Sequence, residues 1–74
     1  MENIEISLSK DEAIVLFEFL ARFSTSDKLE IVDQAEERVL WDIEALLEKI
    51  LVEPFSENWT SIIAEARRRL RDAV

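Results

Sequence analysis

Apolar positions recur at helical spacing over most of the chain. The stretch from Ser9 to Phe23 reads SKDEAIVLFEFLARF and places apolar side chains on most of the circumference of a helix. At about 100° per residue, one stripe is flanked by further apolar positions on both sides. The stripe contains Ala13, Leu16, Phe17, Leu20 and Phe23, and it is widened by Ile14, Ala21, Val15 and Phe19. A surface helix needs a stripe only a little over about 100° wide. We therefore predict a helix at about 10–24 around which the rest of the chain packs.

Two further helices are predicted from capping signals and apolar stripes. Ser9 with Glu12, and Asp33 with Glu36, fit the capping box that begins a helix. The second helix spans about 33–53, because Pro54 disfavours helix in the residue before it. Its expected core face consists of Val39, Leu40, Ile43, Leu46, Leu47, Ile50 and Leu51. Ser56 can cap a third helix at about 57–72, with the stripe Trp59, Ile62, Ile63, Ala66, Leu70 and Ala73.

The N-terminal residues follow a different period. Ile4, Ile6 and Leu8 alternate with polar residues, a pattern typical of a half-buried strand at about 3–8. A single strand is not stable alone. It can pair with residues 28–32, giving a small β-α-β unit, or with the edge of another chain. The expected fold is therefore mainly α, a small α+β domain spanning residues 1–74.

Composition limits both stability and chemistry. A domain of 74 residues has a small core and often needs a disulfide, a metal or a partner subunit. The chain has no Cys, His or Gly, so it lacks thiolate and imidazole ligands, the usual general base and a glycine-rich phosphate loop. The remaining carboxylates, such as Glu37, Glu44 and Glu48, are expected to face solvent. We predict neither catalysis nor a cofactor.

Charge favours a protein partner over nucleic acid or membrane. The chain carries 17 acidic and 9 basic residues, a net charge of −8, which repels phosphates and anionic lipid and attracts basic protein surfaces. The alternative is an ordinary solvated acidic surface. The basic exception is the last helix, with Arg67, Arg68, Arg69 and Arg71. Cations near a helix C-terminus are stabilised by the helix dipole and can pair with acids. Nucleic-acid binding is the competing interpretation.

No stretch is apolar enough to span a bilayer, and the acidic N-terminus is unlike a secretory signal. The expected location is the cytoplasm.

Two sets of residues are interface candidates. Trp41 lies among charged positions of the second helix, with Ala45 and Val52 roughly above it. Either the loop carrying Phe55 covers Trp41, or Trp41 is an exposed anchor, since Trp is enriched at binding hot spots. On the first helix, Val15, Phe19 and Phe23 form a side that a small sheet, a partner or a second copy must cover.

The segments DEAIVLFEFLARF, AEERVLW and LLEKILVEPF together resemble short acidic bacterial proteins of unknown function, in which a strand-like N-terminus precedes an aliphatic helical body. This resemblance implies a bacterial cytoplasmic origin and assigns no functional residue. The leading hypothesis is a non-catalytic module, like an immunity protein or antitoxin, that binds a protein partner. The alternatives are a structural homo-oligomer and, third, nucleic-acid binding through the arginines.

Overall fold

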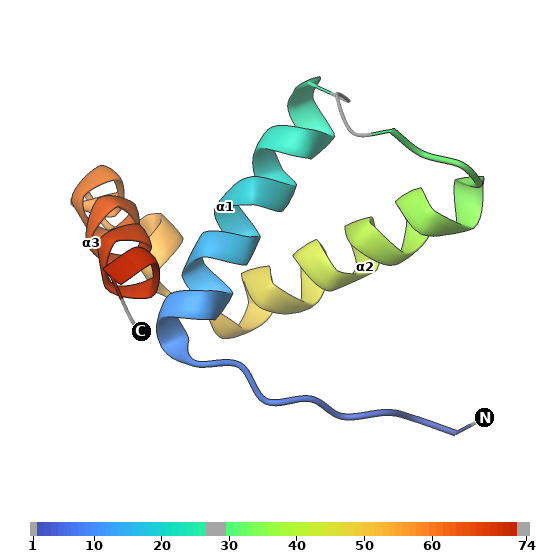
Figure 1. Ribbon diagram of the computed structural model, residues 1–74, viewed down its shortest axis with the longest axis horizontal. Helices are drawn as coiled ribbons and strands as arrows, with labels where there is room; N and C mark the ends of the chain where they lie inside the picture. Colours follow the sequence, from blue (N-terminus) through green and yellow to red (C-terminus); the bar gives the residue numbers. More distant parts are fainter. Residues whose placement is uncertain (1, 27–29, 73–74) are drawn as a thin grey trace.

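Three α-helices and one short 3₁₀ turn make up the secondary structure of the described residues. The computed structural model describes residues 2–26 and 30–72, and only the backbone at 24–26. The helices are α1 (Lys10–Ser26), α2 (Gln34–Ile50) and α3 (Trp59–Asp72), and the turn η1 is Glu53–Phe55. Figure 1 shows α1 lying between α2 and α3. The prediction of three helices is confirmed.

The predicted capping boxes of α1 and α2 are present. The Glu12 amide donates to Ser9 Oγ at 3.1 Å, and the Ser9 amide donates to Glu12 Oε1 at 2.8 Å. At α2, Asp33 Oδ1 accepts from the Ala35 amide at 2.7 Å, and Glu36 Oε1 accepts from the Asp33 amide at 3.4 Å. These bonds satisfy amides that have no partner within the helix.

The core lies where α1 meets its two neighbours. It consists of Ile14, Leu20, Leu47, Leu51, Ile63 and Ala66. Most interhelical contacts join α1 to α2 or to α3. Between α1 and α3, the Phe17 and Trp59 rings meet edge to face, with centroids 6.3 Å apart. The central position predicted for the first helix is therefore confirmed.

The predicted strand at 3–8 is wrong. Within the described residues the N-terminal segment forms no strand, and it leaves the helical body at the start of α1 (Figure 1). The side chains of Ile4 and Ile6 are 89% and 79% exposed. Residues 30–32 of the proposed pairing partner are not a strand either, and 28–29 lie outside the described residues. An alternating pattern predicts a face, but without a paired neighbour the backbone gains no ladder of hydrogen bonds.

Three helix boundaries also differ from prediction. α1 continues to Ser26, not to about residue 24. α2 ends at Ile50, not near residue 53, because the backbone at Leu51 is extended, with φ −83° and ψ 134°. This turn carries the Leu51 side chain into the core, where it is 3% exposed. Pro54 then lies in η1. α3 begins at Trp59, after a turn in which Ser56 Oγ accepts from the Asn58 amide at 3.1 Å.

Candidate interaction surface

The apolar residues of α2 do not form one core face. Leu47 is buried, and Leu40 and Ile43 pack partly against the core. Val39, Leu46 and Ile50 are instead 53%, 58% and 72% exposed. We call these three the α2 apolar row. On a helix of 3.6 residues per turn they lie within about 40° of one another and about 90° from the direction of Leu40 and Leu47. The prediction that all seven residues face the core is corrected.

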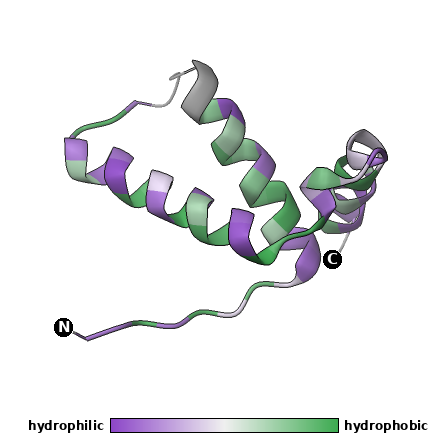
Figure 2. Ribbon diagram, turned by 180° about the vertical axis from the view of Figure 1, so that it is seen from behind, coloured by the Kyte–Doolittle hydropathy of each residue, from purple (hydrophilic) through white to green (hydrophobic). Residues whose placement is uncertain are grey.

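The packing of α1 explains this division. α1 covers one side of α2, while α3 packs on α1 and makes few contacts with α2. A single neighbouring helix covers only part of a wide apolar sector. Figure 2 shows hydrophobic residues interspersed with hydrophilic ones along the length of α2. Exposed apolar surface was expected on the first helix and around Trp41. The structure adds the α2 apolar row, whose residues were expected to face the core.

Trp41 is exposed on the other side of α2. It is 47% exposed, and it lines a shallow hollow with Gln34, Glu37 and Arg38. Phe55, the residue expected to cover it, is itself 77% exposed. Trp41 is therefore accessible to a partner. The loop that carries Phe55 does not cover it.

The remaining candidates on α2 and beyond it are dispersed. Ala45 is exposed one helical turn after Trp41. Val52 is 71% exposed, but it follows the end of α2, so it does not continue that side of the helix.

The candidate surface on α1 is mostly inside the protein. Phe23 is 4% exposed, and Val15 packs partly buried against the core. Phe19 is the most exposed of the three, at 38%, and the Arg22 guanidinium carbon lies 5.7 Å from its ring centroid. The expectation that Val15, Phe19 and Phe23 form one side that a small sheet, a partner or a second copy must cover is corrected, because the other helices already cover most of it.

The arginines of α3 are engaged by carboxylates. Arg67 pairs with Glu18 of α1 at 2.6 Å, and Arg71 lies 4.0 Å from Asp72. Arg68 pairs with Glu65 at 3.0 Å. Pairing with acids within the chain was the expected alternative to nucleic-acid binding.

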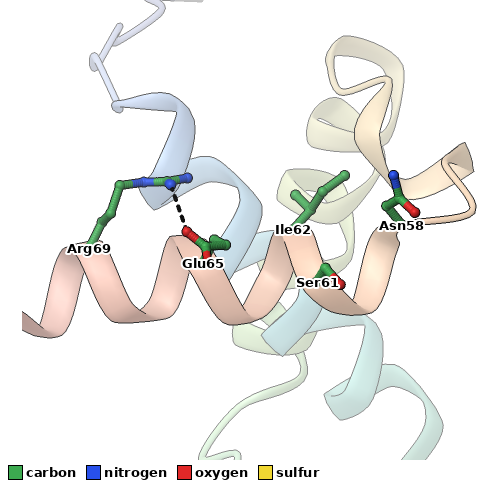
Figure 3. Close-up of a pocket in the computed structure, with 5 residues that line it drawn as sticks. All are labelled: Asn58, Ser61, Ile62, Glu65 and Arg69. Atoms are coloured by element: carbon green, nitrogen blue, oxygen red, sulfur yellow. Dashed lines mark hydrogen bonds and ion pairs between the residues drawn. The ribbon is translucent and has the colours of Figure 1, made fainter.

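Arg69 is the most fully paired of the α3 arginines. Its Nε and Nη2 donate to the two carboxylate oxygens of Asp11, each at 2.8 Å, and its Nη1 reaches Glu65 at 3.5 Å. Figure 3 shows Arg69 and Glu65 in a shallow hollow on α3 that is also lined by Asn58, Ser61 and Ile62. Since all three guanidinium nitrogens have acceptors, this hollow is built around an internal ion pair.

These pairs shift the pKa of the groups involved. The hydrogen bond from Arg69 lowers the pKa of Asp11, and the bond from Lys10 lowers the pKa of Glu53. The bond from Arg68 lowers the pKa of Glu65, and Asp11 in turn raises the pKa of Arg69. Each shift follows from hydrogen bonding to the charged form of the group.

The charge available to a partner is negative and lies mainly around α2, the most acidic helix. It carries five carboxylates and two cations. Glu37 and Glu48 lie within about 40° of Trp41 around the helix. Among the described residues, no group of three or more carboxylates is arranged to hold a metal ion. The surface therefore combines an aromatic side chain with negative charge.

Comparisons with protein-family models, curated proteins and solved structures find no match to this chain. In the described part of the chain, no helix has the length and apolarity needed to cross a membrane.

Proposed function

We propose that this protein is a non-catalytic interaction module that binds a partner protein through the Trp41 side of α2. The partner is proposed to present a basic surface, as the targets of small acidic bacterial inhibitors, immunity proteins and antitoxins often do. The observation that carries the proposal is the exposed Trp41 set beside Glu37 and Glu48 on the most acidic helix.

The aromatic side chain supplies the affinity in this proposal. Exposed Trp side chains bury a large area when a partner covers them and dominate many interfaces. At 47% exposure, Trp41 has surface left to bury. A side chain that is already half-buried before binding has less conformational freedom to lose when a partner covers it.

In this proposal, the charges determine which kind of partner binds. The arginines of α3 face carboxylates of α1 and α3, so they offset part of the acidic charge away from Trp41. The net charge of −8 then attracts a basic surface and speeds its association at low ionic strength. Binding is expected to weaken as salt screens these charges.

The test is co-purification followed by reconstitution. The tagged chain is recovered from its own cells at low salt as wild type, Trp41→Ala and Phe55→Ala. Phe55 is the matched control because it is a second exposed aromatic residue, at 77%, on a different element. The co-purified protein is then produced separately, and its affinity for each variant is measured by isothermal titration calorimetry.

We expect one partner with a basic face, bound about 30-fold or more weakly by Trp41→Ala, as for a hot-spot residue. Phe55→Ala is expected to bind like the wild type, and far-UV circular dichroism should be the same for all three proteins. Retention of the partner at full affinity by Trp41→Ala, or recovery of no specific partner, contradicts the proposal.

A further inference from the structure

The α2 apolar row lies on the opposite side of the helix from Trp41, so the proposed partner does not cover it. Together with half-buried Ile43, its members follow the spacing 39, 43, 46 and 50. Alternating steps of four and three residues are the spacing of a coiled-coil seam. The N-terminal segment does not cover this row, because Ile4 and Ile6 are almost fully exposed.

We infer that a second copy of this chain covers the α2 apolar row, with the two α2 helices packed antiparallel about a two-fold axis. In this register Val39 faces Ile50 of the second copy, and Ile43 faces Leu46 of the second copy. Each contact occurs twice, because a two-fold interface uses the same surface on both partners. The apolar side chains thus form four layers with no polar residue between them.

Charge complementarity selects the antiparallel orientation. Asp42 and Lys49 flank the row on the side away from the core residues Leu40 and Leu47. They are about 10 Å apart along the helix, and within the described part of the chain neither takes part in an ion pair. In the antiparallel pair each Asp42 faces Lys49 of the second copy, which gives two equivalent ion pairs.

A parallel pair lacks this complementarity. It sets the flank that carries Asp42 and Lys49 against the opposite flank of the second copy, where Leu40 and Leu47 already pack beneath α1. Because α1 already occupies that flank, Asp42 and Lys49 of the two copies do not meet across the seam, and neither charge gains a partner.

The size of the seam sets the expected strength. α2 has 17 residues, so it is about 25 Å long, and a contact between two such helices falls at the small end of specific interfaces, below about 1,200 Å² in total. We therefore expect a reversible dimer with a dissociation constant in the micromolar range.

The experiment measures the dimer dissociation constant by sedimentation equilibrium over a concentration series. The variants are Leu46→Glu, its sequence neighbour Ala45→Glu, Asp42→Lys, and the double variant Asp42→Lys with Lys49→Asp. Ala45 is exposed on the Trp41 side, so Ala45→Glu adds the same charge at almost the same height without touching the seam. Circular dichroism checks that each variant is folded.

We expect Leu46→Glu to weaken the dimer about 100-fold or more, because it buries unpaired carboxylates in the seam. Ala45→Glu should dimerise like the wild type. Asp42→Lys should weaken the dimer about tenfold by placing like charges together, and the double variant, which exchanges the two charges, should restore it.

Three outcomes overturn the inference: a wild type that stays monomeric up to about 1 mM, far above the range of weak specific complexes; equal effects of Leu46→Glu and Ala45→Glu; or no restoration in the double variant. The dimer does not depend on the proposed partner. Loss of partner binding in Trp41→Ala leaves the dimer unchanged, and loss of the dimer in Leu46→Glu leaves Trp41 accessible.

Discussion

The substitution Leu20→Ala tests the central position of α1 most directly. The Leu20 side chain is 1% exposed and belongs to the core shared by all three helices. Removing a buried leucine side chain beyond Cβ costs about 2–5 kcal/mol, the larger values applying where the cavity cannot collapse. A protein of 74 residues at about 0.05–0.15 kcal/mol per residue has about 4–11 kcal/mol of stability in total. The substitution should therefore remove a large part of it.

The assay is thermal unfolding followed by circular dichroism, with Leu46→Ala as the matched control. A loss of about 3 kcal/mol corresponds to a fall in Tm of about 12–24 °C in a domain of this size. Leu46 is also a leucine within a helix, but it is 58% exposed, so its change should stay within about 0.5 kcal/mol. Both are measured at submicromolar concentration, below the micromolar dissociation constant expected for the dimer, so that the dimer is largely dissociated. Equal Tm values for the two variants would refute the assignment of α1 as the centre of the core.

Two further predictions concern charged groups. Because their pKa values are lowered by folding, Asp11, Glu53 and Glu65 stabilise the protein fully above their ordinary values of 3.8 and 4.5, and this stabilisation is lost as the pH falls through the lowered values. Tm should therefore be nearly constant from neutral pH to about pH 5 and fall below about pH 4.5, with a shallower fall in Asp11→Asn; a Tm that rises on acidification contradicts this. In a gel-shift assay at low salt, DNA and RNA duplexes should form no complex, because the arginines of α3 are paired with carboxylates. A complex that weakens steeply with salt and is lost in Arg69→Ala would show instead that these pairs open to bind phosphate.

Local signals in the sequence account for the helices and their beginnings. Ser9 with Glu12, and Asp33 with Glu36, form the predicted capping boxes because these bonds span only three residues. The breadth of the apolar sector from Ser9 to Phe23 likewise predicts the central helix, since a helix apolar on most sides must be enclosed. The acidic composition also predicts that the α3 arginines pair with acids. It does not predict that Glu18 and Asp11 are the partners of Arg67 and Arg69.

The partition of apolar residues between core and surface depends on which neighbour covers which side. The sequence places both Leu46 and Leu47 in the broad apolar sector of α2. In the structure, however, Leu47 is buried and Leu46 is exposed. Their difference arises because α3 packs mainly against α1, so that α1 is the main neighbour of α2. Phe23 is buried for the converse reason, since its helix lies between the other two. A periodic sequence thus determined which residues share a face, whereas only the tertiary structure decided which faces meet, because that choice rests on contacts between residues far apart in the chain.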